Sequence, residues 1–249
     1  TVLVSSAVHP HYRRVLQTYL SDLPLTLVEI QFCAAAGTTD PEAFRRKTDS
    51  PPIAVIAQNP NVFGVVEDMS ALAVTAREIG AGFVYVFEPT SLAVLATPGE
   101  VGADIAVAEG QSLGLPLYYG GLALGIFAAR ENFLRRMPGR LVGKTADLDG
   151  REAYCLTLQT REQHIRREKA TSNICTNHTL CAIYAGAYLR LLGADGLQAL
   201  VETAAARLEQ FRTGLKRFGS AVTPAFAGHC LFEIAIRSKR PLEHLPILS

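Results

Sequence analysis

The sequence predicts an α/β fold: a mostly parallel sheet with flanking helices, followed by part of a smaller α+β domain. Short, continuous apolar runs such as Ile53–Ala57 and Phe83–Phe87 are typical of strands buried on both faces of a parallel sheet. Longer segments with helical spacing of apolar residues lie between these runs. Because strands that alternate with helices form βαβ units, the pattern favours a parallel sheet covered by helices.

The first half of the chain supplies the predicted strands in order. Apolar runs predict strands at Val2–Ser5, Leu25–Ile30, Ile53–Ala57, Phe83–Phe87, Asp104–Ala108 and Gly125–Ala129. Helical spacing predicts helices over residues 10–20 and 68–79, and Asp40-Pro41 is a favourable helix start. In the first helix, Val15, Tyr19 and Leu20 are expected on one side. The strand at Ile53–Ala57 ends in the turn Gln58–Asn61, where either a ligand site or a plain strand exit with asparagine capping is possible.

The second half begins with Met137–Gly143, which we interpret as a connector, and a short strand is expected at Tyr154–Leu158. Residues 176–192 predict a long, nearly apolar helix that should be buried and should end at Gly193. A more amphipathic helix over Leu197–Phe218 and an alternating strand over Cys230–Ile236 should follow. We therefore expect a large domain, 1–192, that lacks its N-terminal part, and a truncated small domain, 193–249.

Composition excludes several classes of protein. Nearly half of the 249 residues are apolar, which argues against disorder, and the formal net charge of +1 argues against nucleic acid as a partner. The five cysteines are scattered without a C-x-x-C motif, as expected for reduced thiols in a cytoplasmic protein. No apolar run is long enough to predict a membrane span. His9 and His11 have no third ligand nearby in the sequence, so a metal site is not expected there.

The most polar long segment is Leu158–Cys175, which carries a cluster of cations followed by Thr171, Ser172 and Asn173 just before a predicted helix. Free N–H groups at a helix start, together with cations and hydroxyl groups, suit a phosphate or carboxylate. A solvated helix with spaced charge pairs such as Glu162 and Arg166 explains the same residues equally well.

Five ordered motifs give the chain a family resemblance. They are Asn59–Gly64 (NPNVFG), Gly102–Ile105 (GADI), Glu109–Gln111 (EGQ), Met137–Arg140 (MPGR) and the polar segment 158–175. With these motifs the chain resembles the glycine decarboxylase, or P-protein, of the glycine cleavage system, and above all subunit 1 of its two-subunit form. The resemblance runs from Val8 to Cys175 and more loosely to the end. It implies the fold-type-I pyridoxal-phosphate-dependent transferase architecture, and it suggests that the chain is a fragment of a longer subunit.

The resemblance also bears on the cofactor. Fold-type-I enzymes need a lysine that forms an imine with pyridoxal phosphate. Matching Pro116 and Gly120-Gly121 to the cofactor-carrying half of the family places Gln111 at the lysine position, and the acid position falls near Glu88. Glutamine cannot form an imine, so the resemblance implies that pyridoxal phosphate is held by the partner subunit. The only rival lysine is Lys169.

We therefore expect a non-imine-forming subunit of glycine dehydrogenase (decarboxylating), active only as a complex with subunit 2 in a cytoplasmic heterotetramer. The resemblance implies that this complex decarboxylates glycine and transfers the aminomethyl group to the lipoyl arm of H-protein. No catalytic residue or metal is expected in this chain. The residues expected near the partner's cofactor phosphate are Thr171, Ser172, Asn173, Arg166 and Arg167. A purely structural partner domain, or an independent fold-type-I enzyme using Lys169, are the alternatives.

Overall fold

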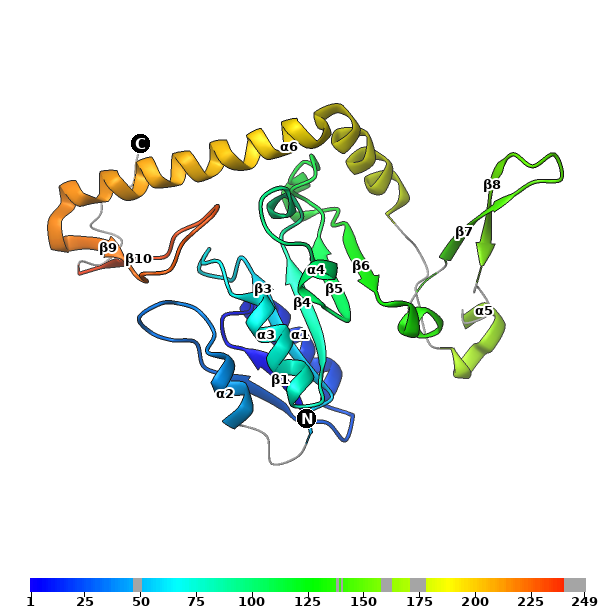
Figure 1. Cartoon of the computed structure of the whole chain (residues 1–249), viewed down its shortest axis with the longest axis horizontal. Coiled ribbons are helices and arrows are strands. Elements are labelled where there is room, and N and C mark those ends of the chain that lie inside the picture. The colour runs from blue at the N-terminus through cyan, green and yellow to red at the C-terminus, as the bar shows by residue number, and fades with distance from the viewer. Residues whose placement is uncertain (47–50, 138, 140, 158–162, 171–177, 240–249) are drawn as a thin grey trace. The chain divides into compact units, whose positions relative to one another are not determined.

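The computed structural model describes residues 1–46, 51–137, 139, 141–157, 163–170 and 178–239. The described chain divides into two compact units, residues 1–128 with 181–249 and residues 129–180. The central feature of the first unit is a six-stranded sheet with the strand order β2-β1-β3-β4-β5-β6 (Figure 1). Its strands are β1 (Val2–Ser5), β2 (Leu27–Ile30), β3 (Ala54–Asn59), β4 (Gly82–Phe87), β5 (Ile105–Glu109) and β6 (Gly125–Ala129).

The sheet is parallel from β2 through β5. The chain passes from β1 outward to β2 and then returns to the other side of β1 to add β3, so the strand order reverses between β1 and β3. In open α/β sheets such a reversal leaves a crevice at the carboxyl ends of the two strands, where ligands bind. The predicted parallel α/β architecture is confirmed, and all six strands lie within a few residues of the expected positions.

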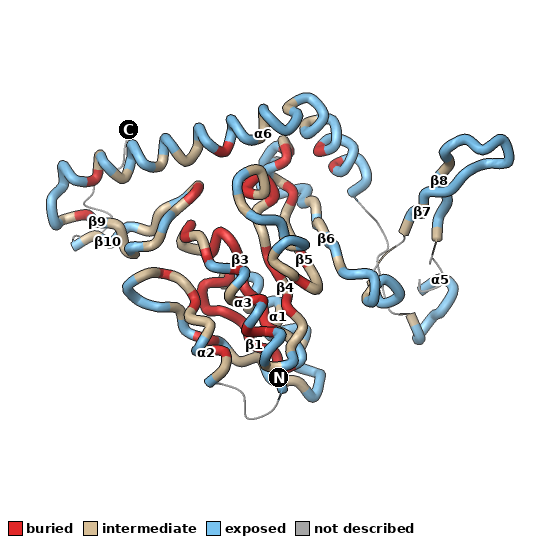
Figure 2. Tube along the Cα trace, viewed as in Figure 1, coloured by how far each residue is buried: buried red, intermediate tan, exposed pale blue. Residues whose placement is uncertain are grey.

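The core forms on the two faces of this sheet. One cluster packs Leu3, Val55, Phe83 and Tyr85 against helix α3 (Met69–Glu78), and these side chains are at most 1% exposed. The other face buries Val4, Val8, Ile56 and Val86 under helix α1 (Pro10–Leu20). Figure 2 shows the buried residues concentrated on β1, β3 and β4. Because these strands are buried on both faces, their sequences are continuous apolar runs and not alternating ones.

Helix α1 has the predicted bounds, but of the three apolar residues expected on one side only Leu20 packs on the core. Val15 and Tyr19 are 51% and 76% exposed, whereas Leu16 and Leu20 pack on the core. Residues 16 and 20 are four apart and share one helix face, so a single apolar row covers the sheet. Asp68 caps α3 through a hydrogen bond from the Ala71 N–H, which confirms the expected start of that helix.

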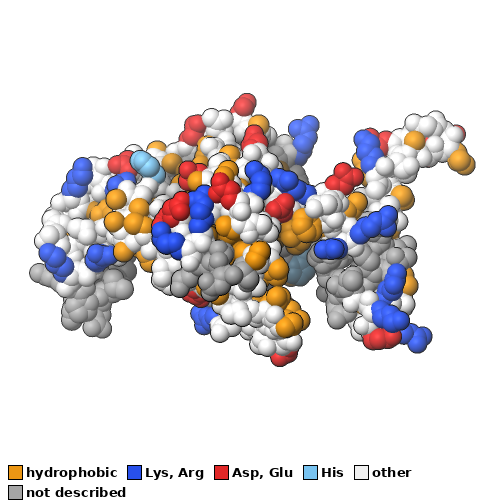
Figure 3. All heavy atoms as spheres, turned by 60° about the horizontal axis from the view of Figure 1, so that its bottom comes forward, with side chains coloured by type: hydrophobic (Ala, Val, Ile, Leu, Met, Phe, Trp, Pro, Cys, Tyr) orange, Lys and Arg blue, Asp and Glu red, His pale blue; other side chains and the backbone are white. Residues whose placement is uncertain are grey.

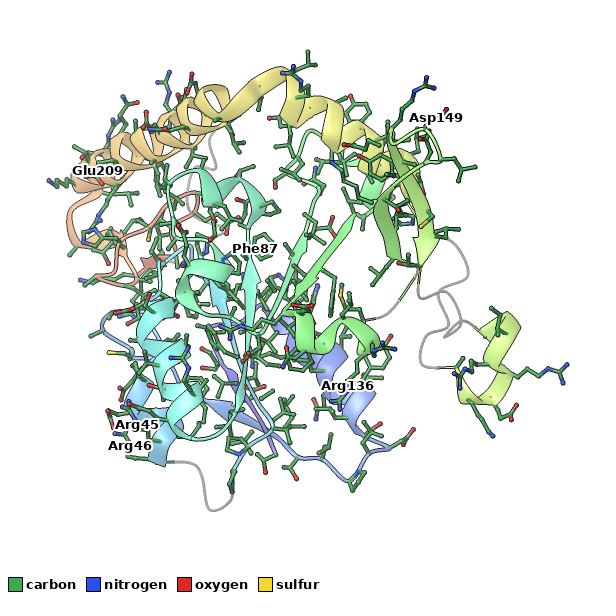
Figure 4. All side chains as sticks on the ribbon, turned by 45° about the vertical axis from the view of Figure 1, so that its right-hand side comes forward. Arg45, Arg46, Phe87, Arg136, Asp149 and Glu209 are labelled. Carbon is green, nitrogen blue, oxygen red and sulfur yellow. The ribbon has the colours of Figure 1, made fainter. Side chains whose placement is uncertain are left out.

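A short helix, α2 (Pro41–Arg46), precedes β3 at the expected start. Its Arg45 forms ion pairs with Glu42 in the same helix and with Glu78 at the end of α3. Arg45 and Arg46 are labelled at the edge of the first unit in Figure 4. Between the sheet strands, α4 (Pro98–Val101) carries a complete capping box formed by Thr97 and Glu100.

The second unit contains an antiparallel hairpin of β7 (Leu141–Ala146) and β8 (Glu152–Thr157), followed by α5 (Gln163–Arg166). The strand expected at Tyr154–Leu158 is confirmed up to Thr157. The interpretation of Met137–Gly143 as a connector is wrong from Leu141 onward, because Leu141 already pairs with Thr157. The Gly143 and Lys144 within β7 hid the strand pattern, since glycine and lysine are both depleted in strands.

Helix α6 (Thr179–Leu215) is the longest element, and Gly193 kinks it with a φ of 64°. The prediction that its first part is buried is wrong: Leu180, Ile183 and Leu191 are 75%, 63% and 87% exposed (Figure 2). Only Cys181 and Ala185 are buried there, because the described chain provides no second element to cover the other apolar side chains.

The C-terminal segment forms a small antiparallel pair of β9 (Val222–Pro224) and β10 (Ile236–Ser238). The strand expected over Cys230–Ile236 is therefore wrong for most of its length. Cys230 makes one isolated bridge to Val65, and regular pairing begins only at Ile236. Among the described residues, no helix combines the length and the apolar character needed to cross a membrane.

Candidate functional site

A pocket of about 460 Å³ lies at the carboxyl ends of β1, β3 and β4, all within the first unit. His9 follows β1, Gln58 lies near the end of β3, and Glu88 and Thr90 follow β4. Ser112 comes from the loop after β5. The pocket therefore sits at the reversal of strand order, where the topology of an open sheet places ligands. Phe87, the last residue of β4, is labelled in Figure 4 and marks the carboxyl end of that strand. Glu88 follows it directly in the sequence.

The opposite wall comes from residues distant in sequence. Helix α6 contributes Tyr188, Leu200 and Ala204, and the C-terminal segment contributes Phe232 and Glu233. Sequence reasoning missed this wall. The pairing of Cys230 with Val65 brings the segment there, and that contact spans more than 160 residues, so no local pattern announces it.

Two glycines permit this close packing. A Cβ on Gly64 would lie 2.0 Å from the backbone oxygen of Glu233, and Gly64 has a φ of 77°. A Cβ on Gly114 would meet the Tyr188 ring at 2.5 Å. Gly64 belongs to the motif Asn59–Gly64, so part of that motif serves the close approach of two backbone segments.

The turn after β3 is built by a buried polar network rather than by free ligand groups. The Asn61 side-chain amide donates to Gly37 O and to Glu67 Oε1, while its own oxygen accepts from the N–H groups of Phe63 and Val65. Asn59 donates to the Tyr85 hydroxyl group. Asparagine capping is therefore present at Asn61, and the same turn also lines the pocket through Gln58, Pro60 and Asn61.

Glu67 is the centre of that network and is only 6% exposed. Its carboxylate accepts hydrogen bonds from the Thr39 N–H, the Thr39 hydroxyl group and the Asn61 amide. Burial raises the pKa of Glu67, while the hydrogen bonds from Asn61 and Thr39 oppose that rise. The carboxyl group is thus fully used in holding the loop around Gly37 to the turn after β3.

Glu88, at the expected acid position, caps the short helix that follows β4. Its Oε2 accepts from the Thr90 hydroxyl at 2.6 Å and from the Ser91 N–H at 2.8 Å. Its Oε1 is buried and has no hydrogen-bond partner among the described residues. A buried carboxylate oxygen left without a partner is energetically costly.

Gln111, at the expected lysine position, is held by the loop in which it lies. Its side-chain amide donates to Leu115 O at 2.7 Å, and its N–H donates to Glu109 Oε1 at 3.0 Å. Among the described residues, the pocket lining includes neither lysine nor arginine. The described lining of this pocket therefore does not fit pyridoxal phosphate, since it offers neither an imine-forming amine nor a cationic partner for the phosphate.

His9 caps α1 and lines the pocket. Its Nδ1 accepts a hydrogen bond from the His11 N–H at 3.2 Å, and desolvation together with the nearby His11 lowers its pKa. No cluster of three metal-ligating side chains occurs in the part of the chain that the structure describes. Across the face of the molecule shown in Figure 3, acidic and basic side chains are interspersed, with no single extended basic surface.

The residues predicted to approach a partner's cofactor belong to the second unit. Thr171, Ser172 and Asn173 lie outside the described residues. Arg166 and Arg167 are exposed, and Arg167 lines a shallow pocket with Gln163, Glu168 and Ala170. Lys169, the rival imine lysine, is exposed at the end of a short 3-10 helix. Its exposure is unlike the environment of a lysine held on a loop after a sheet strand.

Comparison with known proteins adds independent findings. The sequence profile of the glycine cleavage system P-protein matches residues 1–243. The probable glycine dehydrogenase (decarboxylating) subunit 1 of Moorella thermoacetica is 47% identical over 240 residues, which are 96% of this chain and 53% of that protein. A similar subunit 1 from Thermotoga maritima is 48% identical over 197 residues, 79% of this chain and 44% of that protein. The chain thus spans about half the length of the curated relatives it matches.

A crystal structure of glycine decarboxylase (P-protein) in inhibitor-bound form superposes with a TM-score of 0.88 at 40% identity, covering 97% of this chain and 54% of that one. A cysteine desulfurase from Thermococcus onnurineus shares the fold with a TM-score of 0.64 at 20% identity, over 96% of this chain and 57% of that one. These matches confirm the expected fold-type-I architecture.

Proposed function

The chain belongs to the glycine cleavage system P-protein family, and on this premise we propose that it is part of the glycine decarboxylase subunit that does not form the cofactor imine. The observation that carries this proposal is the hydrogen bonding of the Gln111 side chain within its own loop. The family resemblance places the lysine position at Gln111, an amide that cannot form an imine and that is bonded to Leu115 within its own loop. The similarity to proteins named subunit 1 supports the same assignment.

In the proposed complex, pyridoxal phosphate is held by subunit 2 and supplies the electron sink for loss of carbon dioxide from glycine. The aminomethyl group then passes to the lipoyl arm of H-protein. This chain's contribution is to pair with subunit 2 in the cytoplasm and to line the partner's site. The division into a large domain, 1–192, and a small domain from Gly193 is part of the same proposal.

We assign the contact with the partner's cofactor to the segment from Arg166 to Asn173. Arg166 and Arg167 are exposed cations, and Thr171, Ser172 and Asn173 would add neutral donors. Charge-assisted hydrogen bonds to a phosphate are stronger than neutral ones, which favours such a set around an anion. Glu168 lies in the same shallow pocket as Arg167, so the proposed contact depends on the arginines facing the phosphate and Glu168 facing away.

An exchange assay tests the proposed activity. The full-length subunit would be mixed with subunit 2, lipoylated H-protein and glycine, and exchange of labelled bicarbonate into the glycine carboxyl group would be measured. We expect exchange only when both subunits are present. Full exchange by subunit 2 alone would show that this chain is only a structural partner. Exchange by this chain alone would support the alternative that it is an independent enzyme.

A further inference from the structure

The pocket at the carboxyl ends of β1, β3 and β4 has a chemical character of its own. Its polar lining includes two carboxylates, Glu88 and Glu233, and hydroxyl groups from Thr90, Ser112 and Tyr188. Among the described residues, no lysine or arginine lines it. The one imidazole there, His9, has a lowered pKa and accepts a hydrogen bond through Nδ1. The described lining therefore offers two carboxylates and no lysine or arginine side chain.

Glu88 lines the pocket, and its carboxylate is only partly hydrogen bonded. Thr90 and Ser91 hydrogen bond to one of its carboxylate oxygens, but the other oxygen is buried without a partner in the described part of the chain. Buried carboxylates are normally paired with a cation or fully hydrogen bonded. A cation in the adjoining pocket would compensate this charge, whereas a phosphate there would add to it.

The other lining residues indicate the chemical character of the rest of the ligand. Pro60, Val62, Leu200 and Ala204 supply apolar surface, and Phe232 and Tyr188 supply aromatic rings. Aromatic rings attract organic cations, and apolar walls favour a hydrocarbon body over a bare metal ion. The volume of about 460 Å³ lies within the usual range for small-molecule sites.

We propose that this pocket binds a small organic monocation, a primary amine with an apolar body, in place of the phosphorylated cofactor that other members of the fold hold. Glu88 compensates the ammonium charge from the strand side, and Glu233 does so from the C-terminal segment. The site is non-covalent and involves no group transfer. It lies wholly within the first unit and does not depend on the function proposed above.

Calorimetric titration of the full chain with benzylamine tests this proposal, with benzoate and pyridoxal phosphate as anionic probes of similar ring size. We expect saturable one-to-one binding of benzylamine and none of the two anions. Glu88→Gln keeps an acceptor for Thr90 and Ser91 but removes the charge, and should weaken benzylamine binding by roughly tenfold. The control Glu209→Gln changes an exposed carboxylate on α6 and should leave binding unchanged.

Glu233→Gln serves as a second variant, because Glu233 is exposed and its loss should leave the fold intact. It should weaken benzylamine binding several-fold while the thermal unfolding midpoint stays the same. The proposal is overturned if benzylamine shows no saturable binding, if benzoate binds as well, or if both Glu88→Gln and Glu233→Gln bind like the wild type.

Discussion

The side-chain amide of Gln111 donates a hydrogen bond to the backbone oxygen of Leu115 at 2.7 Å, and the Leu115 N–H donates to the backbone oxygen of Gln111 at 3.1 Å. These two bonds close the turn after β5. At the place where the family resemblance puts an imine-forming lysine, the residue is thus a structural clamp of its own loop.

Gln111→Ala should therefore affect stability and not cofactor binding. Loss of the amide hydrogen bond should lower the free energy of unfolding by about 1 kcal/mol, measured by urea denaturation. The cofactor content of the complex with subunit 2 should stay unchanged. Gln198→Ala is the matched control, since the exposed Gln198 side chain donates to exposed Glu202 in α6 and should change stability less. Loss of cofactor at unchanged stability would contradict the structural role of Gln111.

Glu67 should make the stability of the chain depend on pH. Burial raises its pKa above the ordinary 4.5, so the folded protein keeps this proton to higher pH than the unfolded chain does. Between 4.5 and the raised pKa, folding takes up a proton, and this contribution to the free energy of unfolding falls as pH rises.

Glu67→Gln removes that titration, and it also turns an amide NH₂ toward the donors on Thr39 or Asn61. The variant should be less stable than the wild type by roughly 1–3 kcal/mol, and the gap should narrow as pH rises above 4.5. Urea denaturation between pH 4 and 7 measures the gap, with exposed Glu209→Gln as the control. A gap that is constant or widens with pH would show that the pKa of Glu67 is not raised.

Gly64→Ala should be far more damaging than an alanine at another glycine with the same backbone angle. Gly64 and Gly80 have φ angles of 77° and 73°, but a Cβ on Gly80 meets nothing within 4 Å. Gly80→Ala should cost about 1 kcal/mol for the left-handed backbone alone. Gly64→Ala adds a clash with the Glu233 oxygen and should cost roughly 1–3 kcal/mol more. Equal costs in thermal or urea unfolding would mean that the two backbones do not approach as described.

The expected cofactor contacts can be tested in the complex of the full-length subunit with subunit 2. Replacing Thr171, Ser172 and Asn173 by alanine should raise the dissociation constant of pyridoxal phosphate by roughly tenfold or more, because donors to an anion are lost. Helix capping, the alternative role, would cost about 1 kcal/mol of stability and leave the constant unchanged.

The two arginines are tested in the same complex. Arg166→Ala with Arg167→Ala should also weaken cofactor retention, more so at low salt, because screening by salt reduces the wild-type attraction. Arg136→Ala removes an exposed cation from the same unit and serves as control (Figure 4). If this variant and the double variant weaken retention equally, the effect is one of general charge and not of a specific phosphate contact.

The sheet was predictable because local sequence determines it. Strands buried on both faces must be apolar throughout, and Pro10 and Asp68 mark helix starts by their own backbone chemistry. The exposure of Leu180 and Leu191 was not predictable from the sequence. An apolar helix pattern predicts that another surface covers the helix, but not which surface does so. The pocket wall of Phe232 and Glu233 depends on the close approach of the backbone at Glu233 to Gly64, a contact between residues far apart in the sequence.

The central claim is that this chain pairs with a cofactor-holding subunit and does not hold the cofactor itself. Borohydride reduction of the assembled complex, followed by peptide mapping, tests it most directly, because reduction fixes pyridoxal phosphate to the lysine that carries it. The chain offers five lysines: Lys47, Lys144, Lys169, Lys216 and Lys239. We predict stoichiometric labelling of one lysine in subunit 2 and none of these five. Stoichiometric labelling of any of the five, and of Lys169 above all, would contradict the claim.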